Sequence, residues 1–221
     1  MARVHRPSRR ALGALLLAGA GGLLALTVLV APGPGLASSE PGSVRYAVVP
    51  EASEARYRVR EQLAGLSFPN DAVGVTSAVD GQIVLNVGGR VLARASRVSV
   101  DVRTLRSDEP RRDRYVRRNT LETDRYPAVV FVPTELRGLR APLPAAGTVS
   151  FELVGDLTVR EATRRTAWDA TATLEGRDAR VRARTAFRFA DFGLRVPRVA
   201  VVLSVDEVIH LEADLLLRRS P

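Results

Sequence analysis

Strict alternation of apolar and polar residues over long stretches limits most strongly what this chain can fold into. Residues 149–159 place valine, phenylalanine, leucine and glycine at the odd positions, with mostly polar residues between them. The same period of two recurs in residues 168–175, 181–189 and 209–217. This period is the signature of a β-strand with one dry face and one wet face. These long strands therefore have to bury their dry faces in a shared interior.

Turn signals divide the chain from Ser43 onward into eight or nine strand-like segments. The signals are Pro50-Glu51, Asp80-Gly81, Gly88-Gly89 and residues 175–178. Antiparallel strands with one dry face can close into a barrel or stack as a sandwich. A closed set of about eight strands has an interior that side chains just fill, or one that holds a small ligand.

The inward residues of these strands support two opposite interpretations of the interior. Small inward residues favour a hollow interior, and they are Gly155, Ala170, Ala172, Ala183 and Thr185. Large aromatic residues favour a filled one, and they are Phe151, Trp168, Phe187 and Phe189. Protein interiors are normally packed to density, so the residues alone leave both interpretations open.

A strand, a charged helix and a second strand follow one another between residues 98 and 132. Valine alternates with polar residues over 98–103, and a helix is expected after Ser107, whose hydroxyl can cap it. Two acidic residues next to Ser107 place negative charge against the positive end of the helix dipole, and Pro110 is tolerated in a first turn. Tyr126-Pro127 is expected to end the helix and to open the next strand.

Five short motifs in this order carry a resemblance to a known family. They are Arg112-Asp113 in the helix, residues 126–131 (YPAVVF), residues 155–164 (GDLTV followed by ATR), residues 190–194 (ADFGL) and residues 205–208 (VDEV). Through them, residues 44–217 resemble the YceI-like family of lipid- or polyisoprenoid-binding proteins. The resemblance implies an all-β fold, an antiparallel eight-stranded lipocalin-like β-barrel with one short helix near its mouth. It also favours a hollow interior over a filled one.

One departure from the family pattern concerns the rim of the expected pocket. Gly74-Val75-Thr76 stands where the family has Gly-x-Phe after the second strand, and a longer segment over residues 63–70 precedes it. We therefore expect the rim of the pocket to differ from that of typical members.

The first 37 residues have the pattern of an export signal. Four arginines within residues 3–10 precede an uncharged apolar run over residues 11–30, and a small-residue stretch ends at Ala37. The run is also long enough, at about 20 residues, to span a bilayer, so cleavage after Ala37 competes with a retained anchor. The predicted order is signal or anchor 1–37, linker 38–43, β domain 44–217 and tail 218–221. The domain is expected outside the cytoplasm, either periplasmic or secreted, or anchored through residues 11–30.

Composition excludes several classes of function. The absence of cysteine rules out disulfides, thiolate catalysis and Cys-based zinc sites. The net charge of +9 includes four arginines of the leader, and removing them leaves 29 arginines spread among 24 acidic residues. We therefore expect no nucleic-acid partner, whereas attraction to an anionic membrane surface stays plausible. The sequence does not indicate an oligomeric state.

Catalytic and metal-binding patterns are weak in this chain. His210 is the only histidine after the leader, and it lies on a polar strand face without the ligand spacing that zinc needs. No Gly-x-Ser-x-Gly motif presents a nucleophile for hydrolysis. Capping and solvation explain Asp101, Asp108 and Glu109 better than acid–base catalysis does. We therefore expect a protein without enzymatic activity, metal or cofactor.

The predicted ligand is an amphipathic isoprenoid or fatty lipid, held without a covalent step. Its apolar contacts are expected from inward residues of the strands, namely Tyr57, Val59, Val100, Phe131, Phe151, Leu153, Trp168, Phe187, Phe189 and Leu211. The helix carries an arginine cluster that could hold a head group through bidentate hydrogen bonds, and Arg112 is the candidate. The alternatives are that Arg112 ties the helix to the barrel and that the cluster is simply solvated.

Two other functions stay open at this point. A solid barrel would suit an interaction or stress-response module that binds an acidic partner or an anionic membrane. An envelope enzyme acting on an isoprenoid or quinone-like substrate would need polar groups that converge within the interior. Tyr57 and Glu61, on the inward line of the second strand, are the only obvious pair, and a glutamate at the strand-end rim is the simpler interpretation.

Overall fold

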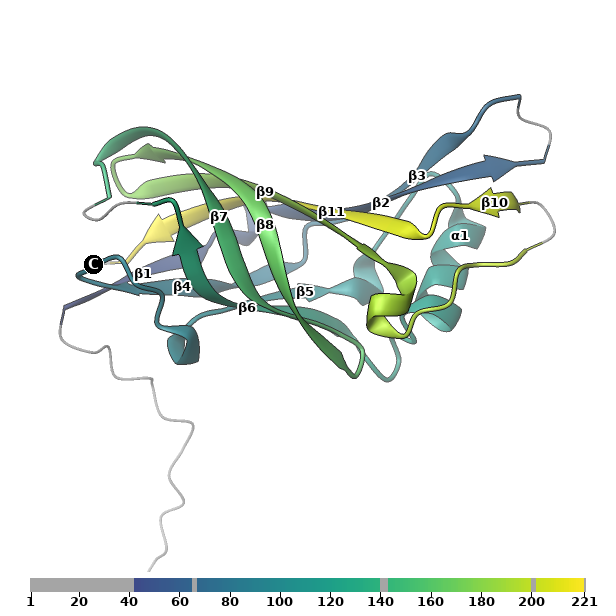
Figure 1. Ribbon diagram of the computed structural model, residues 1–221, viewed down its shortest axis with the longest axis horizontal. Coiled ribbons are helices and arrows are strands. Elements are labelled where there is room, and N and C mark those ends of the chain that lie inside the picture. Colours follow the sequence, from purple (N-terminus) through teal and green to yellow (C-terminus); the bar gives the residue numbers. More distant parts are fainter. Residues whose placement is uncertain (1–41, 65–66, 140–142, 200–201, 221) are drawn as a thin grey trace, which may run out of the picture. The chain divides into compact units, whose positions relative to one another are not determined.

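Eight strands close into a ring in the residues that the computed structural model describes, which are 42–64, 67–139, 143–199 and 202–220. In order around the ring these are β1 (Ser43–Val48), β4 (Val79–Asn86), β5 (Arg97–Asp101), β6 (Ala128–Arg137), β7 (Ala146–Val159), β8 (Ala162–Glu175), β9 (Asp178–Arg188) and β11 (Val208–Arg219) (Figure 1). Pairing of β11 with β1 closes the ring, and every pairing is antiparallel. The predicted all-β antiparallel class is confirmed.

Three further strands extend the sheet beyond the ring at one end. Strand β2 (Glu54–Leu63) pairs with β11, and β3 (Asn70–Thr76) and β10 (Val202–Val205) pair with the two edges of β2. Figure 1 shows the β2–β3 hairpin and β10 at the end of the ring that lies away from the start of β1. Strand β11 continues to Arg219, two residues past the predicted end of the domain at 217.

The described residues belong to one compact unit, Ala37–Pro221. The other unit, Met1–Leu36, lies outside the described residues, and so does the predicted export signal or anchor. None of the helices in the described segments has the length and apolar character needed to cross a bilayer.

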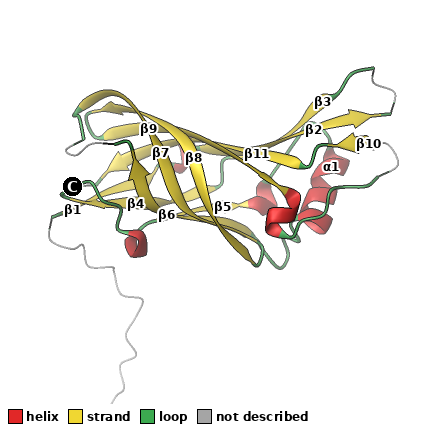
Figure 2. Cartoon of the chain, in the orientation of Figure 1, coloured by secondary structure: helices red, strands yellow, loops and turns green. Residues whose placement is uncertain are grey.

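One short α-helix, α1 (Pro110–Tyr115), and a π-helical turn, η4 (Val116–Thr120), lie near the same end of the ring as β10 (Figure 2). Two details of the predicted helix are wrong. The carboxylate of Glu109, rather than the Ser107 hydroxyl, accepts the first free backbone N–H, that of Arg111. The helical segment also ends at Thr120, well before Tyr126, because Glu122 adopts a φ of 50° that a right-handed helix cannot continue.

Short 3-10 turns complete the described structure. They are η1 (Pro50–Ala52), η2 (Ala93–Ala95), η3 (Val102–Thr104) and η5 (Phe189–Phe192). The turn predicted at Asp80-Gly81 lies instead inside β4. Gly81 has a φ of 130° there, and a Cβ at this position would lie 2.0 Å from the carbonyl oxygen of Arg97. The strand continues because glycine alone permits that approach.

The interior of the ring is filled at one end. Strands β1, β4, β8, β9 and β11 contribute a cluster of buried side chains there, which includes Val48, Ile83, Leu85, Leu174, Val181 and Leu217. A second cluster surrounds Trp168, Phe131 and Leu157 nearer the helix. Packed side chains therefore fill the interior at the end where β1 closes the ring.

Two glycines let aromatic rings lie flat against neighbouring strands. Gly74 of β3 is the register partner of Tyr57, and a Cβ at position 74 would lie 2.2 Å from the Tyr57 ring. A Cβ at Gly155 of β7 would lie 2.5 Å from the ring of Phe131 on β6. With a larger residue at either position, the ring would have to move into the interior. The two glycines therefore leave room for the rings of Tyr57 and Phe131.

Gly74→Ala should destabilise the fold by about 1–3 kcal/mol, as expected for overpacking against a ring that cannot retreat cheaply. Gly88→Ala serves as the control, because its Cβ would meet only the end of the Asn86 side chain at 3.3 Å. Urea unfolding measures both free energies. In a Tyr57→Ala background the cost of Gly74→Ala should largely vanish; an unchanged cost would show that the ring is not its cause.

Candidate functional site

An apolar cavity of about 730 Å³ lies between the ring strands, β2 and the helical segment. Ring strands supply valine, leucine and aromatic side chains, among them Val79, Val98, Leu157, Ile209 and Leu215. Strand β2 contributes its whole inward line, namely Ala55, Tyr57, Val59, Glu61 and Leu63. The helical segment covers the cavity with Tyr115, Val116 and Thr120, and Leu121, which directly follows it, also lines the cavity. A volume in the range of about 300–1,000 Å³ is typical of ligand sites.

Most of the predicted apolar contacts line this cavity. These are Tyr57, Val59, Val100, Phe131, Trp168, Phe187, Phe189 and Leu211. Their assignment to the interior followed from the period of two, which fixes the face of each strand residue. Whether they contact a lipid stays a prediction, since the structure shows their position alone.

Phe151 and Leu153 are not part of the cavity wall, and whether they contact a lipid stays a prediction. Both face the interior from β7, but side chains of the core clusters cover them. Leu153 is buried opposite Trp168, and Phe151 lies opposite Ala170, where it packs against both core clusters. Alternation identifies the inward face but not how far along the ring the packed core extends.

Two parts of the cavity wall were not predicted from the sequence. One is the helical segment, whose Tyr115, Val116 and Leu121 turn toward the cavity although the segment looks charged throughout. The other is the stretch that leads into β10, with Pro197, Val199 and Val202. The only signal in the sequence was the presence of these apolar residues between arginines.

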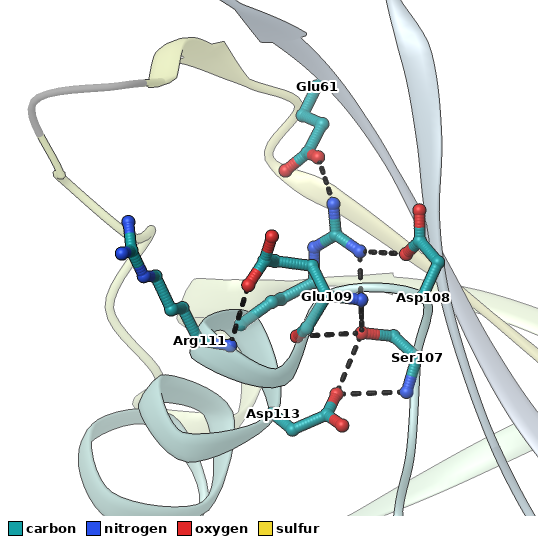
Figure 3. A network of polar contacts seen from close by, with 7 residues as sticks. Glu61, Ser107, Asp108, Glu109, Arg111 and Asp113 are labelled. Atoms are coloured by element: carbon teal, nitrogen blue, oxygen red, sulfur yellow. Dashed lines mark hydrogen bonds and ion pairs between the residues drawn. The ribbon is translucent and has the colours of Figure 1, made fainter.

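Arg112 on α1 is held by two carboxylates. Its Nη2 donates to Glu61 on β2 at 2.6 Å, and its Nη1 donates to Asp108 at 2.5 Å (Figure 3). The side chains of Arg112 and Glu61 are only 14% and 8% exposed. Glu61 is therefore a buried partner and not a rim residue. Burial lowers the pKa of Arg112, but the hydrogen bonds and charges of Asp108 and Glu61 outweigh it and raise the pKa overall.

Asp113 bonds to Ser107 and not to the neighbouring Arg112. The Asp113 carboxylate accepts from the Ser107 hydroxyl at 2.7 Å and from its backbone N–H at 2.9 Å (Figure 3). These bonds fix the segment that enters the helix, while the bond from Arg112 to Glu61 ties the helix to β2. Of the roles considered for Arg112, the tie between helix and sheet is therefore the one for which bonds are present.

Arg111 is placed differently from Arg112. Its side chain is exposed and lines the cavity, and its guanidinium forms no ion pair with any residue in the described ranges. Figure 3 shows it extending away from the cluster around Arg112. Arg111 therefore places a guanidinium without an ion-pair partner in the cavity wall, beside the carboxylate of Glu109.

Arg112→Ala should cost about 3 kcal/mol of stability, because it leaves the buried Glu61 carboxylate without its partner. Arg103→Ala is the matched control, since Arg103 is exposed and pairs with Asp101 at the surface, where such pairs contribute little. Chemical denaturation of both variants measures the difference. Equal effects would mean that the bond from Arg112 to Glu61 does not secure the helix.

Burial raises the pKa of Tyr57 to about 12, and the nearby Asp113, Glu61 and Asp108 add to the effect while Arg112 opposes it. Tyr57 should therefore ionise late in an absorbance titration at alkaline pH, and Tyr57→Phe should remove that step. The raised pKa means that Tyr57 favours the folded state below pH 10 and that this contribution is lost between about pH 10 and 12. Ionisation of Tyr57 near pH 10 would contradict its burial in the apolar wall of the cavity.

The other polar residues considered from the sequence have local roles. Asp101 accepts from the backbone and side chain of Arg103, and these bonds hold its pKa below its ordinary value. His210 is exposed on β11 and pairs with Arg58 across the sheet. Within the described ranges, no group of three or more His, Asp or Glu side chains could hold a metal ion.

Comparison with known families decides where this chain belongs. The model of the YceI-like domain matches residues 46–217. The chain belongs to the YceI-like family. The resemblance drawn from the five motifs is thus confirmed, over nearly the predicted range. Among curated proteins, none matches the chain.

Solved structures of three bacterial proteins are similar to this YceI-like chain. A polyisoprenoid binding domain from Saccharophagus degradans has a TM-score of 0.61 at 10% identity, over 79% of this chain and 98% of that one. BcnA of Burkholderia cenocepacia has 0.56 at 14%, over 76% and 98%. The YceI protein of Campylobacter jejuni has 0.53 at 12%, over 72% and 91%. At these identities the likeness concerns the fold.

Proposed function

We propose that this YceI-like protein binds an amphipathic isoprenoid or fatty lipid, without a covalent step, in the cavity beneath the helical segment. The observation that carries the proposal is the cavity itself, about 730 Å³ with a wall that is mainly aliphatic and aromatic. The similar domain from Saccharophagus degradans is described as polyisoprenoid-binding, which supports a ligand of this class. In these terms the ring acts as a lipocalin-like β-barrel that is hollow at one end.

Affinity for such a ligand would come from the hydrocarbon tail. Each methylene moved from water into the cavity contributes roughly 0.8 kcal/mol. Val79, Val98 and Leu215 line the cavity and also belong to the packed cluster. We therefore assign the end of the hydrocarbon tail to this part of the wall. A tail that gains free energy along its length needs few polar contacts for tight binding.

The head group belongs at the helical end, where the charged wall residues lie. Glu61 and Arg112 neutralise each other there, and the Glu109 carboxylate accepts the backbone N–H of Arg111. The guanidinium of Arg111 is free to bind a phosphate or carboxylate. We therefore assign the contact with an anionic head group to Arg111 in place of Arg112.

A carrier or sequestering role outside the cytoplasm fits these features best. The export pattern over residues 1–37 supports delivery to the cell envelope, with or without a retained anchor at 11–30. The solid-barrel alternative required a filled interior, and the cavity argues against it. The enzymatic alternative relied on Tyr57 and Glu61, but Glu61 is bonded to Arg112, so we propose binding without catalysis.

Trp168 provides a direct assay, because it lines the cavity and is the only tryptophan of the chain. Titration with a long-chain polyprenol or fatty acid should change its fluorescence and saturate. Val129→Phe puts extra volume into the cavity and should weaken binding at least tenfold. Val130→Phe is the matched control, since Val130 is the next residue on β6 and lies outside the cavity wall.

Equal affinity of the Val129→Phe and Val130→Phe variants, with both folded by circular dichroism, would show that the ligand does not occupy the cavity. A lack of any saturable change in the wild-type protein, with either class of lipid, would remove the proposed function altogether.

A further inference from the structure

The end of β2 carries an apolar rim that is continuous with the cavity wall. We define the rim as Leu63, Phe68, Pro197, Val199, Val202 and Leu203. Leu63, Pro197, Val199 and Val202 line the cavity, and Leu63 pairs with Val202 across β2 and β10. Phe68 lies in the turn that joins β2 to β3, next to the same strand end. The hollow interior therefore reaches solvent through an apolar border.

Two rim residues are unusually exposed for their size. Phe68 is 80% exposed and Leu203 is 67% exposed. The other strongly exposed large apolar residue in the described ranges is Val87, at 80%. Val87 directly follows β4, whose last residue pairs with the first residue of β1, so it lies at the packed end of the ring. Exposed apolar side chains are thus concentrated where the cavity opens.

Unpaired positive charge accompanies the rim. Arg198 lies between the cavity-lining Pro197 and Val199 and is exposed, and Arg195 precedes them. Neither they nor Arg111 form an ion pair with any part of the chain that the structure describes. At the helix start Asp108 is paired with Arg112, and Glu109, which accepts only a backbone N–H, balances one of these three positive charges.

We propose that this rim docks on the surface of an anionic bilayer, with Phe68 and Leu203 inserted among the lipid chains and Arg111, Arg195 and Arg198 against the head groups. The inference rests on the proposed lipid-binding function. Apolar side chains bordered by arginine are the pattern of interfacial membrane binding. Because the rim and the cavity wall share four residues, a hydrocarbon tail passes from the bilayer into the cavity without crossing water.

A label on single cysteines tests this contact, because the chain has no cysteine of its own. Phe68→Cys, Leu203→Cys and Val87→Cys, each in the full chain, are coupled to a polarity-sensitive fluorophore and mixed with vesicles of phosphatidylcholine and phosphatidylglycerol at 3:1. The labels at 68 and 203 should shift to the blue and brighten severalfold. The label at 87, equally exposed at the packed end, should stay unchanged.

The test does not depend on residues 1–37. If these residues anchor the protein to the vesicle, each label still reports only the polarity around its own position. Arg111→Gln combined with Arg198→Gln should weaken the response at 68 at least tenfold, and pure phosphatidylcholine should do the same. Equal responses at 68 and 87, or none at 68 while the protein sediments with vesicles, would overturn the docking of the rim.

The Trp168 titration separates this inference from the function on which it rests. Saturable lipid binding reported by Trp168, with no response of the labels at 68 and 203, would reject the docking and retain the cavity as a lipid site. Label responses without any lipid binding at Trp168 would reject the lipid-binding function, and with it the role proposed for the docked rim.

Discussion

The divided pairing of β11 determines where this protein is solid and where it is hollow. Leu217, Arg218 and Arg219 pair with β1, which closes the ring, whereas residues 210–214 pair with β2. Strand β2 extends beyond the ring and pairs with β3 on one edge and β10 on the other. The closed end has neighbours on every side and packs to density. At the other end the sheet opens, and the helical segment has to cover the exposed interior.

A few largely buried polar bonds hold the helical segment over the cavity. Arg112 joins the helix to Glu61 of β2, and Ser107 holds Asp113 at the start of the helix. A buried ion pair adds little stability relative to an apolar contact, so we interpret its value here as positional. It fixes the charged face of the helix and turns Tyr115, Val116 and Leu121 toward the cavity. Apolar wall and polar entrance thus come from one short segment.

The period of two in the sequence was sufficient to predict the fold class and the inward face of the strands. It placed Val59, Trp168 and Phe187 correctly, since alternation leaves a strand residue only two directions. It could not show how far packing extends along the ring, so Phe151 was assigned to the cavity. The bond from Arg112 to Glu61 joins residues 51 positions apart, and only the assembled sheet brings these two residues together.

In the proposed function, the hollow end of the ring holds a hydrocarbon chain. Native mass spectrometry of the protein isolated from its own cells measures this most directly. We expect a bound mass of isoprenoid or fatty type, one molecule per chain, that is released on unfolding. A folded protein without any such mass, or one carrying a polar solute in its place, would contradict it.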